Sequence, residues 1–535
     1  MDPAGPGPFA IFQLPFPRSP VPSKDSAQRF SSRWGLLLSV LGIAVGTGNI
    51  WRFPRIAATN AGDDGAGAFL VAWLVFLVVW SLPLIIAEYA LGQKGRRGVV
   101  GTFATVAGGK FAWLGGFVAL VAAAIMCYYS VVAGWCAYYV ATSAASGLPV
   151  TSESSLAGWS AFQGSIWPII LHGGMMGLGV WAVSRGVSGI ERANKVLVPT
   201  LLVIVVIAVI RAVTLPGAGD GLAFLFTPDW GTLTDASIWL EALTQNAWDT
   251  GAGWGLILTY AAYMRREDGV FRNAVLTGVG NNTVSLLAGT MVFGIVFAVL
   301  GSEMSRPEIL EIMRNSGERG TGLTFIWMPP LFAEMPLGRP LAVLFFVALA
   351  FAALSSLLSM IELSTRVFVD FGFDRKKAVM GVGGVAFLLG VPSALSGEVF
   401  GNQDFVWGVA LMLSGAFIAL AVWKHGASRL REAVYVETDW KLPKIWDTWI
   451  TVAIPLQAVV LLGWWLWLAA TAYSENALDP LEPYSAATCV VQWSIALVGL
   501  YLANKWMIKR LALTRPVDPA DAPDMLTTDD AFRTP

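Results

Sequence analysis

The sequence predicts an all-α polytopic membrane protein with 12 transmembrane helices. Of its 535 residues, 56% are hydrophobic and only 13% are charged, whereas soluble domains carry about 25% charged residues. Apolar runs long enough to cross a bilayer recur along the chain. Two of them, the first and the sixth, are interrupted by clusters of glycine. Together these observations favour a secondary transporter, because such proteins build ion and substrate sites from interrupted helices.

Twelve apolar runs have the length and the lack of charge expected of membrane spans. They lie at about 34–59, 68–93, 112–144, 165–184, 194–214, 238–264, 271–301, 339–368, 377–395, 404–423, 446–472 and 485–508. An even number of spans places both termini on one side of the membrane. Lys and Arg cluster in alternate loops, such as 94–97, 185–195 and 265–272, whereas 147–165 has none. The positive-inside rule therefore predicts a cell (inner) membrane protein with both termini in the cytoplasm.

The two ends of the chain differ from its middle. Residues 1–30 and 511–535 are Pro-rich and lack long apolar runs, so we expect disordered cytoplasmic tails. Residues 31–423 contain ten spans, and 424–510 contain helices 11 and 12. The loop 302–339 is long enough to hold helices of its own, and its arginines do not conflict with the positive-inside rule, from which long loops are exempt.

Three glycines interrupt each of two apolar runs. They are Gly42, Gly46 and Gly48 in the first run and Gly251, Gly253 and Gly255 in the sixth. A glycine inside a helix costs about 1 kcal/mol relative to alanine, so both helices are expected to break. Their spacing predicts two inverted repeats of five helices, 31–214 and 236–423, each beginning with a broken helix. The unpaired backbone groups at each break must face protein, water or a ligand.

Four charged residues stand out within the apolar runs, and such residues are functional candidates because a charge in the membrane is costly. They are Arg52, Glu88, Asp249 and Asp404. Asp249 lies at the second break, where its carboxylate, nearby free carbonyls and the amides of Asn49 and Asn281 would provide hard oxygen ligands for a cation. The alternative is that Asp249 only caps the second half-helix.

Glu88 and the serine pair each leave two interpretations open. Glu88 either bonds to the broken first helix or takes part in packing. Ser355 and Ser356 are adjacent in the eighth run, and serines within a membrane helix usually donate to the backbone of their own helix or to another helix.

The composition also disfavours several function classes. The net charge of −1 gives no sign of nucleic-acid binding. The three cysteines have neither disulfide nor metal spacing, and two histidines are too few for a histidine metal site. No nucleophile–base motif or cofactor fingerprint indicates an enzyme, and no feature indicates an obligate protein partner.

Residues 42–54 read G-I-A-V-G-T-G-N-I-W-R-F-P. This block closely resembles the first helix of the neurotransmitter:sodium symporter family, which includes bacterial amino-acid symporters and animal monoamine, GABA and glycine transporters. Further matches follow in order: G-A-F-L from Gly67, Y-Y-x5-W from Tyr128, the break in the sixth run, Asn281, A-x-L-S-S from Ala352 and D-F at Asp404. The resemblance covers residues 30–423 and implies a sodium:amino-acid symporter with the LeuT-type fold.

The resemblance implies two sodium sites. The first would be formed by the carbonyl of Ala44, the side chains of Asn49 and Asn281, and Asp249. The second would be formed by the carbonyls of Gly42, Val45 and Ala352 and the hydroxyls of Ser355 and Ser356.

The resemblance also assigns a substrate site and two gates. The substrate carboxylate would meet the first sodium, the amide of Gly48 and the hydroxyl of Tyr129. The other residues expected around the substrate are Ala44, Thr47, Ile125, Trp248, Asp249, Gly251, Trp254, Ser356 and Met360. The outer gate would consist of Arg52 and Asp404 with Trp248 as a lid, and the inner gate would include Tyr263 and Asp370.

Three departures from the family pattern modify this assignment. Asp249 stands where members usually have Ser or Thr, Ser285 is not acidic, and Trp73 replaces a tyrosine. Because a bound chloride would face the Asp249 carboxylate at low dielectric, we predict chloride-independent transport in which Asp249 is the built-in negative charge. At the inner gate, the arginine that the family pattern places at about Ala27 is absent, so Arg29 or Arg33 is the expected partner of Asp370 instead.

The third departure concerns the substrate. Gly46 lies where monoamine transporters keep an aspartate, and Gly251 replaces a larger residue. These differences predict a hydrophobic or aromatic amino acid, carried with sodium by alternating access. Proton-coupled or sodium-free transport, and a non-transporting amino-acid sensor, are the alternatives.

Overall fold

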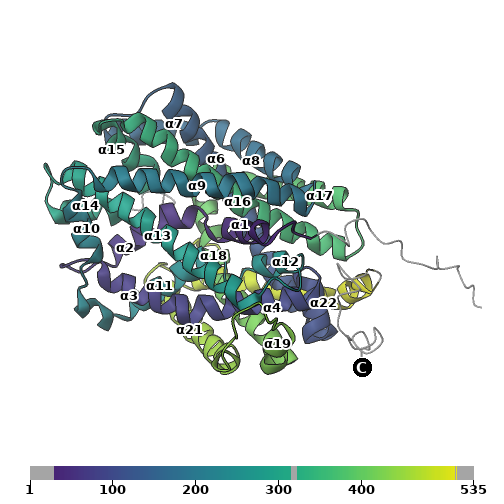
Figure 1. The fold of residues 1–535 in the computed structure, drawn as a ribbon. Helices are drawn as coiled ribbons and strands as arrows, with labels where there is room; N and C mark the ends of the chain where they lie inside the picture. Colours follow the sequence, from purple (N-terminus) through teal and green to yellow (C-terminus); the bar gives the residue numbers. More distant parts are fainter. Residues whose placement is uncertain (1–28, 315–321, 513, 515–535) are drawn as a thin grey trace, which may run out of the picture.

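The computed structural model describes residues 29–314, 322–512 and 514, and it consists of packed helices (Figure 1). Within these ranges there is no β-strand, and the only extended pairing is one bridge between Ala66 and Pro228. Nearly all of the two predicted tails, 1–30 and 511–535, lies outside the described residues.

The first five predicted spans coincide with helices. Their bounds are α1 (Arg33–Ala44), η2 (Gly48–Arg52) and α2 (Phe53–Thr59); α3 (Gly67–Phe76), η3 (Leu77–Ser81) and α4 (Leu82–Gly95); α5 (Val99–Thr102), η4 (Phe103–Ala107), η5 (Gly109–Phe111) and α6 (Ala112–Ala145); α8 (Trp167–Val183); and α9 (Val187–Val213). Shorter helices between the spans are α7 (Ser152–Gln163), α10 (Ala218–Phe226) and η6 (Trp230–Thr234).

The remaining predicted spans also coincide with helices. Their bounds are α11 (Ala236–Asp249) and α12 (Leu256–Ala261); α13 (Val270–Leu300); α16 (Gly338–Asp370); α17 (Arg375–Leu395); α18 (Gly397–His425); α20 (Ile445–Thr448), η9 (Trp449–Ala453) and α21 (Ile454–Thr471); and α22 (Ala486–Leu511). The predicted loop helices are present as α14 (Arg306–Arg314), η8 (Gly322–Trp327) and α15 (Met328–Glu334), and α19 (Ala427–Ala433) follows α18.

Nine helices of the described chain, and two bent helix pairs, are long and apolar enough to cross a membrane. One bent pair is α1 with η2–α2, which turn by 47°. The sixth predicted run is not among the eleven because a stretch without regular helix, residues 250–255, separates α11 from α12. The total of twelve spans therefore stays a prediction, although each predicted run contains a helix.

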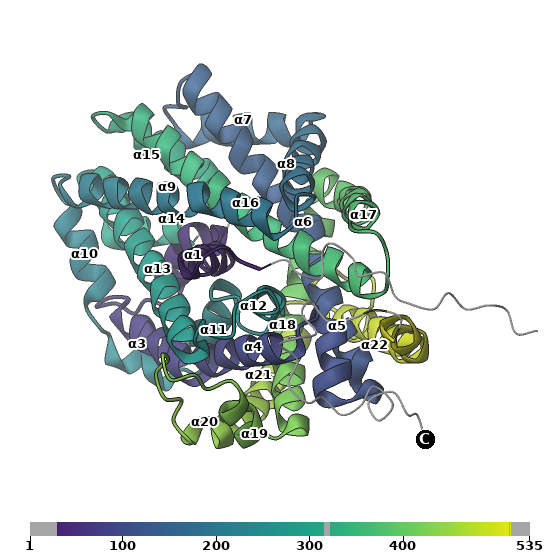
Figure 2. The same ribbon diagram turned by 45° about the vertical axis from the view of Figure 1, so that its right-hand side comes forward.

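The first helix lies in the middle of the molecule. Figures 1 and 2 show α1 enclosed by other helices, and it contacts α9, α12, α13 and α16. Peripheral helices instead expose large apolar side chains, such as Val203 and Ile210 on α9 and Val459 and Trp467 on α21. Buried glycines inside and apolar side chains outside are what a bundle surrounded by lipid requires.

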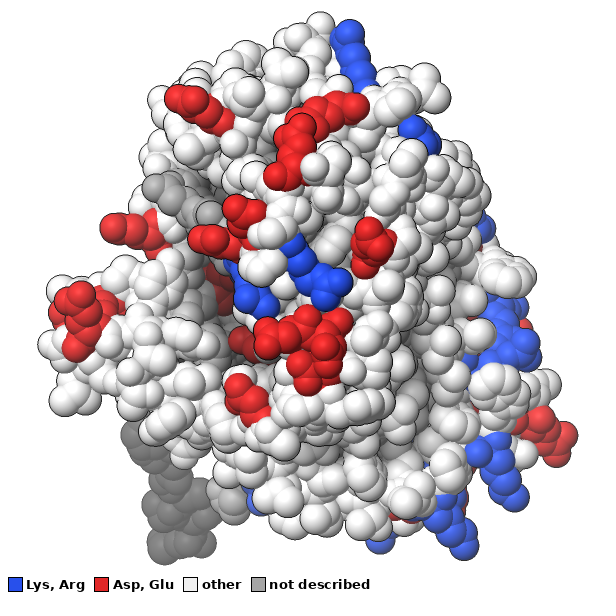
Figure 3. All heavy atoms as spheres, turned by 90° about the vertical axis from the view of Figure 1, so that its left-hand side faces the viewer, with Lys and Arg blue, Asp and Glu red and all other residues white. Residues whose placement is uncertain are grey.

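Charged side chains gather at one end of the bundle. The end that carries α7, α10, α14 and α15, which we call the α14 face, has many acidic side chains around a few basic ones (Figure 3). The opposite end, the α22 face, holds both ends of the described chain. There Phe30 N donates to Tyr263 O at 3.3 Å, and Thr514 Oγ1 donates to Asp370 O at 2.6 Å. The prediction that both termini lie on one side agrees with this arrangement.

Candidate functional site: a cavity between two interrupted helices

The first helix is interrupted after Ala44, at the predicted place. Val45 leaves the helical region with φ −81° and ψ 85°. The Gly46 N–H then donates to the side chain of Asn49 at 2.8 Å and to Ala44 O, only two residues back, at 3.0 Å. A π-helical turn, η2, leads into α2. The side chain of Asn49 thus helps to satisfy an N–H group at the break, and the carbonyls of Gly42 and Ile43 at the end of α1 accept from a side chain of another helix.

The second interruption follows Asp249 and depends on glycine. Gly251, Gly253 and Gly255 have φ of +69°, +93° and +76°, a region that other residues rarely adopt. The carboxylate of Glu88 accepts hydrogen bonds from Gly253 N at 2.7 Å and from Leu258 N at 3.0 Å. Of the two interpretations left open for Glu88, a bond to the broken first helix is wrong: Glu88 bonds to the second break, because α4 packs against α12.

The two interruptions meet. The half-helix α11 contacts η2, and the half-helix α12 contacts α1. Each first half thus packs against the other helix's second half, so the two broken helices run antiparallel, as inverted repeats require.

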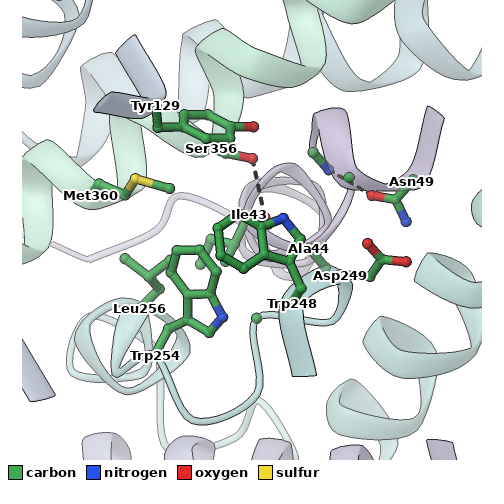
Figure 4. A pocket seen from close by; sticks show the side chains of 13 residues that line it. Ile43, Ala44, Asn49, Tyr129, Trp248, Asp249, Trp254, Leu256, Ser356 and Met360 are labelled. Carbon is green, nitrogen blue, oxygen red and sulfur yellow. Dashed lines mark hydrogen bonds between the residues drawn. The ribbon is translucent and has the colours of Figure 1, made fainter. Parts of the chain in front are cut away.

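A cavity with an empty volume of about 310 Å³ lies between the breaks (Figure 4). Its walls are formed by Ile43, Ala44, Gly46, Gly48, Asn49, Tyr129, Trp248, Asp249, Gly251, Trp254, Leu256, Ser356 and Met360. Asn49 and Asp249 lie on one side, and Trp254, Leu256 and Met360 lie on the other. The cavity therefore has a polar end for charged groups and an apolar end for a hydrophobic side chain.

Oxygen atoms converge at the polar end. One end of the Asn281 side-chain amide lies 2.9 Å from Ala44 O and 3.2 Å from Asp249 O, distances at which the amide donates when its nitrogen faces the two carbonyls. Asn49 Nδ2 donates to Asn281 Oδ1 at 2.7 Å. Amide and carbonyl oxygens suit a hard cation such as sodium, so the residues predicted for the first sodium site lie together.

The carboxylate of Asp249 belongs to the same network and is 3% exposed. Its Oδ2 accepts from Gln245 Nε2 at 2.5 Å and from Ser285 Oγ at 3.1 Å, while its Oδ1 has no hydrogen-bond partner in the described chain. Asn49 also donates to Ser285, at 2.7 Å. Asp249 thus bonds laterally to α13 and does not merely cap a half-helix.

The residues predicted for the second sodium site lie where α16 meets the end of α1. Ser356 Oγ donates to Gly42 O at 3.3 Å and to Ile43 O at 3.2 Å. Ser355 Oγ donates back to Ala352 O at 3.0 Å. Both interpretations of the serine pair are thus present: one serine bonds to its own helix, and the other reaches the broken helix.

A vestibule with an empty volume of about 1350 Å³ lies beside the cavity and includes Arg52, Glu241 and Asp404. Trp248, Gly48 and Tyr129 line both spaces. Arg52 donates to Gln245 at 2.6 Å and lies 3.8 Å from Glu241.

Asp404, the other predicted outer-gate residue, accepts from the hydroxyl of Tyr128 at 3.2 Å. In the described chain the ion pair of Arg52 is therefore with Glu241 and not with Asp404.

The predicted inner-gate residues are buried at the α22 face. Asp370 pairs with Arg366 at 2.8 Å and accepts from Gly98 N at 2.7 Å. This partner is neither Arg29 nor Arg33, the two considered from the sequence. Tyr263 donates to Glu362 at 2.6 Å. Asp370 and Tyr263, the two predicted inner-gate residues, are thus each bonded to a buried charged side chain of α16.

Comparison with known proteins identifies the family. A model of the sodium:neurotransmitter symporter family matches residues 27–159 and 167–514. The chain belongs to this family. It is 32% identical over 458 residues to an uncharacterised sodium-dependent transporter of Methanocaldococcus jannaschii, with 81% of this chain and 90% of the relative covered. It is 27% identical over 532 residues to the sodium-dependent serotonin transporter of Drosophila melanogaster, with 90% of this chain and 83% of the relative covered.

A solved structure shares the fold of this symporter. The crystal structure of MhsT in complex with L-phenylalanine superposes with a TM-score of 0.71, at 31% identity, covering 81% of this chain and 98% of MhsT. This similarity confirms the predicted LeuT-type fold. The family consists of sodium-coupled transporters and not of enzymes.

Most of the predicted substrate residues of the symporter line the cavity, and two do not. Thr47 lines the vestibule, where its N–H donates to Tyr129 OH at 3.2 Å, and Ile125 is fully buried outside the cavity wall. Their roles stay predictions. Ile43 and Leu256 were missed, and only their positions next to the two breaks could have indicated them.

Proposed function

We propose that this symporter carries hydrophobic or aromatic amino acids together with two sodium ions, by alternating access and without chloride. The observation that carries the proposal is the single cavity between two antiparallel broken helices, with oxygens converging at one end and Trp254, Leu256 and Met360 at the other. A zwitterionic amino acid with a large apolar side chain has the complementary shape and polarity.

Sodium and the amino acid would bind side by side. The substrate carboxylate would lie at the first sodium, near Gly48 and the hydroxyl of Tyr129, because that end of the cavity offers a cation and backbone N–H groups. Its ammonium group would meet carbonyls at the breaks. Contact between carboxylate and sodium makes each ligand strengthen the binding of the other, which is the coupling that symport requires.

The substrate class is supported by the cavity walls. Asp249 is the only carboxylate that lines the cavity, and it is bonded to Gln245 and Ser285. At Gly46 the cavity wall carries no acidic side chain. MhsT, of similar fold, was crystallised with L-phenylalanine.

Alternating access would use the vestibule and the inner cluster as its two gates. Pairing of Arg52 with Asp404, with Trp248 beneath them, would close the vestibule. Separation of Asp370 and Tyr263 from their partners would open the α22 face. In the cell (inner) membrane, with both termini cytoplasmic, the α14 face would be the outer side.

The test is a thermal-shift screen of the purified protein with the twenty amino acids, in sodium and in potassium buffer. We expect stabilisation by bulky apolar or aromatic amino acids in sodium only. Equal stabilisation in potassium would contradict sodium coupling, and stabilisation only by glycine or GABA would contradict the substrate class. Ser356→Ala should weaken the sodium response, whereas the control Ser364→Ala, a buried serine elsewhere on α16, should not.

Uptake into liposomes distinguishes the alternatives. Uptake driven by a pH gradient without sodium would indicate proton coupling, and binding without any uptake would indicate a sensor.

A further inference from the structure

Asn194 on α9 is a buried amide without a hydrogen-bond partner. Its side chain is 0% exposed, and neither Oδ1 nor Nδ2 is bonded within the described chain. A buried polar group left without a partner costs about 1–3 kcal/mol, so native proteins pair such groups with protein, water or an ion. Among the described side-chain amides, this is the only one in which both polar atoms lack a partner.

The amide oxygen of Asn194 lies against the residues proposed for the second sodium site. A methyl group placed on Gly42 would come within 3.1 Å of Asn194 Oδ1 and within 3.2 Å of Ser355 Cβ. Gly42 and Ser355 are two of the five residues assigned to that site. Because Gly42 has no side chain, nothing separates the amide oxygen from the end of α1.

A polar row continues along α9 from Asn194 toward the α22 face. Glu191 lies one turn nearer the start of the helix, on the side that packs against Gly35 of α1. It accepts from Ser31 N at 2.9 Å and pairs with Lys195 at 2.8 Å. The contact between α1 and α9 thus contains polar groups at two successive turns. The hydrogen bond and ion pair of Glu191 lie at the end of this row that is nearer the α22 face.

We propose that Asn194 is a ligand for the sodium ion of the second site, directly or through one water, as the ion moves between that site and the α22 face. This inference rests on the proposed function and adds a residue to it. An amide oxygen is a hard, neutral ligand. It can replace part of the hydration shell of sodium without holding the ion as tightly as a carboxylate, and ions pass only through sites that also release them.

Three variants test the role of Asn194. Asn194→Leu removes the polar atoms at similar size, and Asn194→Asp adds a negative charge. Val198→Ala is the matched control, because Val198 also packs within 3.1 Å of the Gly42 methyl position but has no polar atom. The probe is radioactive sodium, bound at equilibrium to the purified full-length protein and followed during release from proteoliposomes.

We expect Asn194→Leu to raise the half-saturating sodium concentration by about 3–10-fold, the loss typical of one polar contact. Asn194→Asp should lower that concentration and slow sodium release. Binding of L-phenylalanine at saturating sodium should be unchanged in both, whereas a merely structural residue would alter it. Val198→Ala should leave the sodium dependence unchanged.

The same sodium dependence in Asn194→Leu, Asn194→Asp and Val198→Ala would overturn the inference. If Asn194→Leu does not fold, the Asp variant alone decides, because unaltered sodium affinity and release in that variant would overturn it as well. If the parent protein itself binds no sodium, the proposed function fails. This outcome is distinguishable from failure of the Asn194 inference, because it is seen in the parent protein without any variant.

Discussion

Replacing Asp249 by serine should turn a chloride-independent transporter into a chloride-dependent one. The carboxylate is 3% exposed, and its Oδ2 lies 3.1 Å from Ser285 Oγ. A chloride ion bound by the Ser285 hydroxyl would therefore lie about 4 Å from a buried negative charge, given ordinary hydrogen-bond lengths.

The size of the effect follows from this distance. Two like charges about 4 Å apart repel by about 4 kcal/mol at an effective dielectric constant of about 20. This repulsion weakens chloride binding about a thousandfold. In Asp249→Ser the repulsion is absent, and a hydroxyl takes the place of the carboxylate. The site then lacks its fixed negative charge, so an external anion must supply it.

The assay is sodium-driven uptake of the amino acid identified by the screen, into liposomes, with chloride or gluconate outside. Parent uptake should be equal in both anions, whereas uptake by Asp249→Ser should be at least about tenfold higher in chloride. Asp220→Ser, in the short helix α10, is the control for a lost surface charge and should behave as the parent. A several-fold rise of parent uptake with chloride would refute the reasoning.

Three further substitutions test the cavity. Glu88→Gln leaves one acceptor oxygen for two N–H groups of the second break, so the free energy of unfolding should fall by about 1.5–3 kcal/mol. Thermal-shift assays should also show that sodium no longer stabilises the protein. An unchanged melting temperature would contradict this. Tyr129→Phe should weaken amino-acid binding about tenfold, or about 1.4 kcal/mol, with little change in the melting temperature; unaltered affinity would remove the hydroxyl from the substrate site. Gly251→Ala places a methyl group 3.1 Å from Ile43 Cγ2 at a φ of +69°, which costs about 1–2 kcal/mol in backbone strain alone. Competition assays should show a larger loss for bulky substrates than for small ones, and an equal loss for both would contradict the assigned wall.

The interruptions could be predicted from the sequence because helix breaking is a local property. Gly251, Gly253 and Gly255 adopt positive φ where the spacing of glycine predicted a break. The place of Asn49 at the first break could be predicted for a related reason, since Asn49 lies one turn beyond Gly46 and bonds to it. Asn281 is far away in the chain, and only the family resemblance placed it there.

Partners that depend on helix packing could not be predicted. Glu88 bonds to the second break and not to the first because α4 packs on α12. Arg52 pairs with Glu241 in the vestibule, a contact that no short motif encodes. Asp370 is a different case, because it pairs with Arg366 one turn away in its own helix, whereas the family resemblance indicated an arginine near the N-terminus.

The central claim is that a sodium ion and the carboxylate of an amino acid touch each other between the two breaks. Calorimetric titration of the purified protein with L-phenylalanine and with phenethylamine, which lacks the carboxylate, each in sodium and in potassium, tests it directly. The account predicts that sodium strengthens L-phenylalanine binding at least about tenfold, by 1.4 kcal/mol or more, and leaves phenethylamine unaffected. Equal binding of L-phenylalanine in both salts, or an equal sodium effect on phenethylamine, would contradict it.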